Sequence, residues 1–169
     1  MEIIKGILTR RSIRKYSDKE ISKKQIIELV KAGMYAPSAR NQQPWHYIII
    51  NDSELLNKIS DIHPYAKMLT QAKWAIIVCG DENLELSKGY WVVDCSAATQ
   101  NILLAAHGFG LGAVWLGLHP HEERKNAIKD LFHLPANIQP LSLISIGYPA
   151  EEIDQPERLK MERIHHNQW

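Results

Sequence analysis

The sequence has little cysteine, no excess of charge of either sign and no long apolar run. Its two cysteines, Cys79 and Cys95, lie in apolar surroundings and make neither a disulfide framework nor a zinc-binding spacing, so we expect reduced core residues. Lys and Arg number 20 against 19 Asp and Glu, which gives a formal net charge of +1. This balance predicts no general attraction to nucleic acid or to an anionic membrane, so any basic function must be local.

Membrane-spanning and secreted proteins are disfavoured by the same lack of apolar runs. No stretch approaches the ~20 apolar residues of a membrane span. The charges of Glu2 and Lys5 near the start argue against a signal peptide. We therefore expect a cytoplasmic protein with no membrane partner.

Signatures of several enzyme classes are also missing. The sequence has no Gly-x-Ser-x-Gly elbow and no P-loop, which removes the simplest hydrolase and kinase classes. Its eight histidines include no helical i,i+4 pair with a carboxylate partner, so we expect no metal site.

The residues that are present fit a single domain over 1–169 with a core of its own, at 45% hydrophobic composition. The hydrophobic patterns predict helices near 3–9, 22–36, 52–62, 68–69, 90–107 and 121–134, and strands at 45–50, 74–80, 113–117 and 141–147. Because unequal stretches separate the strands, a regular βαβ repeat is not supported, and the pattern indicates an α+β fold.

Two segments predict contacts beyond the chain itself. The helix expected at 90–107 is apolar nearly all the way round, which requires burial on more than one side. The C-terminal tail, residues 148–169, is polar and charged with scattered apolar residues and a terminal Trp169. Such a tail either frays or wraps a partner.

The glycine-rich stretch "GFGLG" (108–112) resembles a dinucleotide-binding motif only in composition. A Rossmann fingerprint follows a strand and opens a helix, whereas this stretch closes a helix and opens a strand. We interpret it as a glycine helix cap followed by a tight turn.

Two polar stretches are candidates for binding. "RRSIR" (10–14) places three guanidinium groups and a hydroxyl within five residues, which suits a phosphate, although a solvated basic turn is the alternative. "PSARNQQPW" (37–45) carries three carboxamides, each with a donor beside an acceptor that can pair with the edge of a flat group. Its alternative is a polar helix-to-strand connection. Together with the glycine turn, the stretches at 10–14 and 37–45 match what a flat phosphorylated cofactor such as FMN requires: a phosphate site, hydrogen bonds to a ring edge and a close approach of the backbone.

Five stretches in order, "RRSIRKYSDKEIS", "APSARNQQPWHYIII", "YAKML", "DCSAATQNILLAAHGFGLGAVWLG" and "GYPAEE…ERIHHNQW", resemble the nitroreductase family of FMN-dependent oxidoreductases. The resemblance covers essentially the whole chain. It implies an α+β fold with a central, mainly antiparallel sheet flanked by helices, and an intertwined homodimer with FMN at the subunit interface. NADH or NADPH would donate the hydride, and the tail would wrap the partner subunit.

The resemblance also assigns the phosphate end of the site. Arg10, Ser12 and Arg14 match the family pattern that holds the FMN phosphate, ribityl chain and pyrimidine, with Arg11 as a neighbouring candidate. Arg158 and Lys160 compete for the C-terminal basic residue that completes the phosphate site, and Arg158 is preferred.

The ring end of the flavin is assigned in the same way. Pro37, Ser38 and Asn41 match the loop that each subunit lends to the flavin of its partner. Leu116 and Gly117 match the segment whose backbone faces the reactive N5 edge. Lys67 corresponds to a basic residue near the flavin carbonyls.

The implied activity is a ping-pong reduction of nitroaromatics, quinones or related small electron acceptors, in which no side chain acts as a catalytic acid because the flavin carries the chemistry. The chain lacks room for the inserted helices that roof the active site of longer members. Alternatives are a flavin-binding or redox-sensing dimer without turnover, and a dehalogenase-like branch of the same superfamily. A nucleic-acid module built on the arginines is disfavoured by the neutral charge.

Overall fold

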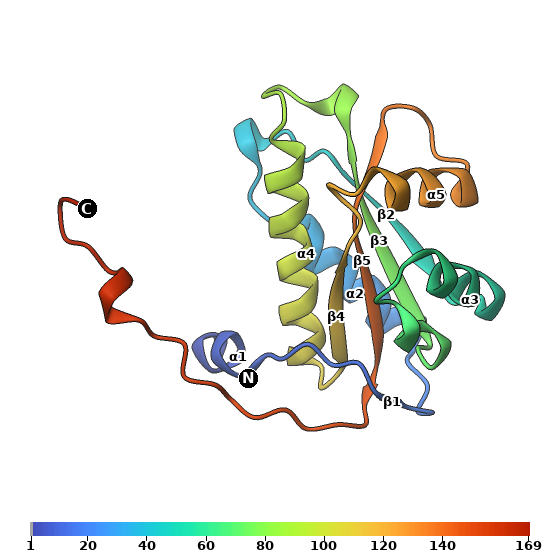
Figure 1. Cartoon of the computed structure of the whole chain (residues 1–169), viewed down its shortest axis with the longest axis horizontal. Helices are drawn as coiled ribbons and strands as arrows, with labels where there is room; N and C mark the ends of the chain where they lie inside the picture. Colours follow the sequence, from blue (N-terminus) through green and yellow to red (C-terminus); the bar gives the residue numbers. More distant parts are fainter. Residues whose placement is uncertain (1) are drawn as a thin grey trace.

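The computed structural model describes residues 2–169, and its centre is a five-stranded sheet with helices on both faces (Figure 1). The strands are β1 (Tyr16–Ser17), β2 (Trp45–Ile50), β3 (Trp74–Asp81), β4 (Gly112–Gly117) and β5 (Ile138–Pro149). The α-helices are α1 (Ile3–Thr9), α2 (Lys23–Met34), α3 (Ser53–Ile62), α4 (Trp91–Gly108) and α5 (Glu122–Phe132). Short 3₁₀ helices are η1 (Ala39–Asn41), η2 (Lys67–Thr70), η3 (Glu82–Leu84) and η4 (Met161–Arg163).

The named strands pair antiparallel, with β5 bonded to β3, to β4 and, near its end, to β1, while β2 pairs with β3. The predicted α+β fold with a mainly antiparallel sheet is therefore confirmed. Strand β1, only two residues long, escaped prediction because its hydrophobic pattern is too short to register. Among the residues that the structure describes, no helix is long and apolar enough to cross a membrane.

Strand β3 contributes side chains to two separate cores, because successive side chains of a strand point to opposite faces of the sheet. Ile76 and Val78 point into the core beneath α2 and α4. Ala75, Ile77 and Cys79 point into the core beneath α3 and α5. Burial on both faces explains why this strand reads as a continuous apolar run rather than an alternating one.

The local signals that predicted the helix ends are formed. Ser22 and Gln25 make the capping box of α2. Helix α4 ends in a Schellman motif, in which Leu111 N–H donates to the Ala106 carbonyl at 2.8 Å and Gly110 takes a φ of 72°. The glycine stretch is thus a helix cap and turn, as interpreted.

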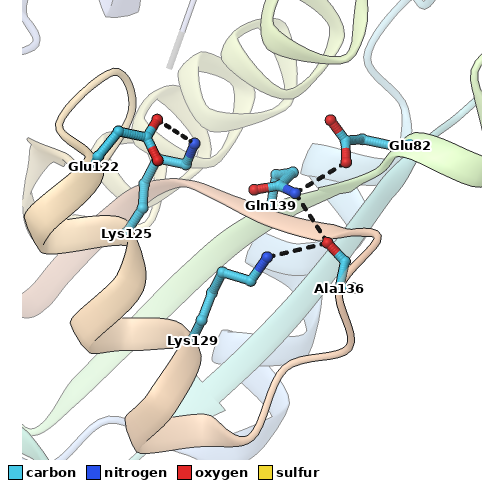
Figure 2. Close-up of polar contacts among 6 residues, drawn as sticks. All are labelled: Glu82, Glu122, Lys125, Lys129, Ala136 and Gln139. Atoms are coloured by element: carbon cyan, nitrogen blue, oxygen red, sulfur yellow. Dashed lines mark hydrogen bonds and ion pairs between the residues drawn. The ribbon is translucent and has the colours of Figure 1, made fainter.

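Helix α5 is tied to the start of β5 by side-chain bonds to a loop carbonyl (Figure 2). Lys129 Nζ and Gln139 Nε2 each donate to the Ala136 carbonyl at 3.0 Å, and Gln139 also donates to Glu82 at 2.9 Å. These contacts fix the position of a helix that contributes to the site below.

One side of α4 and most of α1 remain uncovered. Helix α4 packs Cys95, Ala98 and Ile102 against the sheet, but Val93 is 61% exposed. Helix α1 has no buried residue. The tail beyond Pro149 runs past α1 and away from the sheet (Figure 1). Within a single chain α4 is covered by the sheet and by α2, but the side that carries Val93 stays exposed.

Candidate functional site

The arginine cluster lines a cavity of about 460 Å³ between the end of α1 and the tail. Arg10 and Arg11 face Arg158 across it, whereas Lys160 is not among the lining residues. Nη1 of Arg10 is buried and has no hydrogen-bond partner within residues 2–169. Burial, followed by the charges of Arg158 and Arg11, lowers the pKa of Arg10. An anion such as phosphate would satisfy the free donor and offset the repulsion.

Arg11 differs from Arg10 because its donors are used within the chain. Its Nε donates to the Asp154 carbonyl at 3.1 Å, and its Nη1 donates to the carbonyls of Leu8 and Arg10 at 3.0 and 2.6 Å. Arg11 therefore pins the tail to the end of α1 and holds the wall of the cavity. Arg14 is exposed: its Nη1 donates to the Ser12 carbonyl at 3.5 Å, and its backbone N–H donates to the Glu151 carboxylate at 2.5 Å.

Strand β4 has an open edge that runs away from the arginine cluster. Ser12 bridges Ala113 at its start, and Ile13 N–H donates to the Ala113 carbonyl at 3.0 Å. At the other end, Leu118 N–H donates to Leu141 of β5, so the backbone groups of Gly117 point away from β5. The N–H of Gly117 finds no partner in the described part of the chain. From Ala113, which Ser12 and Ile13 cover, to Gly117 the edge runs about 13 Å.

Gly117 is not required by packing or by its backbone conformation. A Cβ at this position would come no closer than 3.7 Å to its nearest neighbour, an ordinary contact. A glycine that the fold does not need, on an open strand edge, leaves space for a ligand to approach the backbone.

The amide-rich loop is fastened to α4 by Asp94, a buried carboxylate. Asp94 accepts from Ala39 N–H at 2.9 Å and from Gln42 Nε2 at 2.6 Å. Gln42 Oε1 in turn accepts from the N–H groups of Leu86 and Ser87 at 2.7 and 3.1 Å. Gln42 thus serves the fold, and its amide is not available to a ligand.

Gln43 is also engaged inside the loop, since its Nε2 donates to Asn41 Oδ1 at 2.9 Å. Ser38 accepts from Gln43 N–H at 3.0 Å, and Pro37 and Asn41 are exposed. The interpretation that all the amides of this loop face a flavin is therefore too broad. Asn41 and Gln43 keep exposed positions, and of the two only Asn41 is a predicted site residue.

The loop and the arginine cluster lie at opposite ends of α4. Asp94, near the start of the helix, holds the loop, while His107, near its end, contacts Thr9 of α1 at 2.8 Å. Thirteen residues of α-helix separate these contacts by about 20 Å. The structure therefore does not bring Pro37, Ser38 and Asn41 to Arg10 within one chain.

Lys67 lies on η2, on the face of the sheet that carries α3. Its neighbours Met68 and Leu69 are buried, whereas Lys67 itself is exposed. Within residues 2–169, no group of three or more His, Cys, Asp and Glu side chains is arranged to hold a metal ion.

Sequence reasoning missed Asp94, His63 and Arg124. Asp94 had a visible signal, because it is a lone acid in an otherwise apolar helix. His63, which precedes Pro64 just after α3, carried no binding signal in the sequence, but it is buried and its Nε2 contacts the Gly117 carbonyl. Arg124, whose Nη1 donates to the same carbonyl, had no signal in a charged surface helix.

Comparison with known proteins agrees with this fold. The model of the nitroreductase family matches residues 7–75 and 63–148. A relative from Methanothermobacter thermautotrophicus, named "Putative NADH dehydrogenase/NAD(P)H nitroreductase", is 47% identical over 100% of this chain and 88% of its own length. The chain belongs to the nitroreductase family, and the prediction of a nitroreductase-like oxidoreductase is confirmed.

Two solved structures are similar over almost the whole chain. A protein of the same name from Parabacteroides distasonis has a TM-score of 0.95 at 41% identity, covering 99% of this chain and 98% of its own. A Desulfovibrio desulfuricans protein, described as a "putative nitroreductase in complex with fmn", has a TM-score of 0.88 at 30% identity, covering 100% and 98%.

Proposed function

We propose that the protein is an FMN-dependent oxidoreductase that takes hydride from NADH or NADPH and reduces nitroaromatic, quinone or related small acceptors. The observation that carries the proposal is the buried, unpartnered Nη1 of Arg10 in a cavity that Arg11 and Arg158 also line. A monophosphate ester fits that donor set. The names of the relatives, which include NAD(P)H nitroreductase and a complex with FMN, support the same cofactor.

FMN, when bound, supplies the hydride-accepting centre. The chain would bind and orient it: Arg10, Ser12 and Arg158 at the phosphate, and the open edge of β4, as far as Leu116 and Gly117, beside the ring. Arg14 and Lys67 would add positive charge where negative charge develops on the reduced ring. Arg14 follows Ile13, which bonds to Ala113 at the start of this edge, and Lys67 precedes Met68 and Leu69 of η2, which share a core with Val114 and Leu116 of β4.

We propose a ping-pong order, because both substrates would use the same open side of the site. The nicotinamide would leave before the electron acceptor enters, so that the acceptor receives two electrons and takes its proton from solvent. No side chain of the site is required as a catalytic acid.

The site is proposed to be completed by a second copy of the chain. Exposed apolar side chains on α1 (Ile3 at 79% and Ile4 at 69%) and on α4 (Val93 at 61%) support burial in a homodimer. Residues 148–169 would wrap the partner subunit, and the loop carrying Pro37, Ser38 and Asn41 would reach the partner's flavin.

The first test is whether the purified protein binds FMN and is reduced by NADH or NADPH. Denaturation should release FMN rather than FAD, because the cavity offers one compact phosphate site. A stopped-flow screen of the reduced protein against quinones, nitroaromatics and enones then identifies the acceptor class. A protein that cannot be loaded with FMN contradicts the proposal, and one that is reduced but never rapidly reoxidised is a flavin-binding sensor instead.

A further inference from the structure

Gly117 presents two polar backbone groups at the open edge of β4, and only one of them is free. Its carbonyl oxygen accepts from Nε2 of His63 at 3.0 Å and from Nη1 of Arg124 at 3.2 Å. Its N–H has no partner among residues 2–169. A group that approaches this edge therefore meets a hydrogen-bond donor, while the neighbouring acceptor is already occupied.

The bond made by Nδ1 of His63 shows that Nε2 is the nitrogen that donates to the Gly117 carbonyl. Nδ1 accepts from the N–H of Tyr65 at 3.2 Å, so Nδ1 carries no proton and Nε2 is the donor. The side chain is 1% exposed, which keeps water from competing for either bond. The imidazole is thereby held as a neutral donor aimed at the Gly117 carbonyl.

Arg124 reaches the same carbonyl from a different element. Its guanidinium carbon lies 5.7 Å from the ring centroid of Tyr65, whose ring meets that of His63 edge-on at 6.2 Å. Helix α5 is itself held by the bond from Lys129 to the Ala136 carbonyl, which Gln139 of β5 also contacts (Figure 2). Two donors from outside β4 thus fix one carbonyl of a residue whose backbone is intrinsically free to move.

We propose that His63, with Arg124, is a positioning residue that occupies the Gly117 carbonyl so that only the Gly117 N–H faces the N5 edge of the flavin. The inference rests on the proposed function. N5 of an oxidised flavin accepts a hydrogen bond, whereas the reduced ring carries N5–H and needs an acceptor. With the carbonyl occupied, the oxidised ring gains a bond here and the reduced ring gains none. The arrangement therefore stabilises oxidised over reduced FMN and lowers the reduction potential, which favours transfer of electrons from the reduced flavin to the acceptor.

The test compares two substitutions of His63 in the FMN-loaded protein. His63→Phe keeps a ring of similar size but removes both nitrogens, and His63→Gln retains a side-chain N–H donor. In His63→Phe we expect the preference for reduced over oxidised FMN to rise about tenfold, the scale of one hydrogen bond. For a two-electron couple this is a positive shift of about 30 mV in reduction potential. His63→Gln should return the potential most of the way to the wild-type value.

Two further measurements separate positioning from simple destabilisation. Thermal unfolding of each variant reports any structural loss, which alone would not move the potential of the bound flavin. In the FMN-free protein, the carbonyl ¹³C chemical shift of Gly117 should change in His63→Phe and not in His63→Gln. His46→Phe, at an exposed histidine of β2, is the matched control and should leave both the potential and this shift unchanged.

Arg124→Met provides a second variant on the surface of α5, in case His63→Phe does not fold. It should raise the preference for reduced over oxidised FMN as well, but only about threefold, since the bond from Arg124 to the carbonyl is the longer of the two, at 3.2 Å against 3.0 Å. If the folded variants change the preference for reduced over oxidised FMN by less than about twofold, the inference is overturned. A wild-type protein that does not bind FMN overturns the proposed function instead, and that result appears before any variant is compared.

Discussion

The carboxylate of Asp94 accepts from Gln42 Nε2 at 2.6 Å and thereby joins the amide-rich loop to the first turn of α4. The same carboxylate accepts from Ala39 N–H, and Gln42 continues the network to Leu86 and Ser87. Three separate segments of chain meet through two side chains. The loop proposed to serve the partner's flavin is therefore preformed rather than flexible.

Breaking this network should loosen the loop. In Asp94→Asn, one carboxylate oxygen is replaced by an NH₂ group. Gln42 cannot turn its amide to compensate, because its Oε1 already accepts from Leu86 and Ser87, so a buried N–H donor loses its acceptor. We expect a loss of about 2 kcal/mol in the free energy of unfolding, measured with urea, together with weaker FMN binding. Asp61→Asn, at an exposed position of α3, is the control and should change stability by less than about 0.5 kcal/mol. Equal stability of the two variants would show that the Asp94 bonds contribute little.

The phosphate cavity predicts different effects for neighbouring basic residues. Arg10→Ala and Arg158→Ala should each weaken FMN binding by about 2 kcal/mol, the scale of a charge-assisted contact, whereas Lys160→Ala should have little effect. Fluorescence titration of the FMN-free protein measures all three. The stability of Arg10→Ala should not fall, because Arg10 is repelled by Arg158 and Arg11 in the folded chain. A larger loss of affinity in Lys160→Ala than in Arg158→Ala would reverse the assignment.

Gly117 offers a test of the open edge that does not depend on charge. The chain has room for a Cβ at this position, with the nearest neighbour at 3.7 Å, so Gly117→Ala should unfold within a few degrees of wild type. A ligand that lies against the backbone would meet the new methyl group, and FMN affinity should fall at least about tenfold. Gly108→Ala, where a Cβ would meet nothing within 4 Å, is the matched control. Unchanged FMN affinity in Gly117→Ala would place the flavin elsewhere.

Acid should destabilise the protein partly through His63. Burial, followed by the nearby charges of Arg124 and His121, lowers the pKa of His63 below its ordinary value of 6.5. The folded state therefore prefers the neutral ring, so this stability is present above pH 6.5 and is lost as the pH falls below it. His107 and His119 shift in the same direction. The decrease in melting temperature from pH 7.5 to 5.5 should be smaller in His63→Gln than in wild type, and an equal decrease would remove His63 as a contributor.

Local chemistry made much of the fold predictable. The helices expected to start near residues 22 and 52 do so, at the capping box of Ser22 and at the Asp52 cap, and the glycine turn after α4 is formed as expected. These features were predictable because their signals lie within a few residues of sequence. The contacts that shape the site join distant segments instead. Asp94 meets Gln42 across 52 residues and His63 meets Gly117 across 54, and no local pattern encodes such pairs. The amide cluster of the loop was therefore assigned to a ligand when part of it serves the fold.

The last prediction follows from the separation of the two halves of the proposed site along α4. Asp94 and His107 anchor the loop and the arginine cluster about 20 Å apart, so a flavin bound at Arg10 would meet the Asn41 of another subunit. Arg10→Ala and Asn41→Ala homodimers should each bind FMN poorly. In a heterodimer of the two, one site carries both defects and the other carries neither.

Mixing should therefore restore activity. The two variants are unfolded and refolded together, heterodimer formation is verified by mass, and NAD(P)H oxidation is assayed with saturating acceptor and limiting FMN. With random pairing half of the dimers are mixed, and each mixed dimer holds one intact site, so about a quarter of wild-type activity should return. If both residues served the flavin from the same chain, every site would retain one defect and mixing would restore nothing. That result would place the loop beside the flavin of its own subunit and contradict the shared site, even in a protein that binds and reduces FMN.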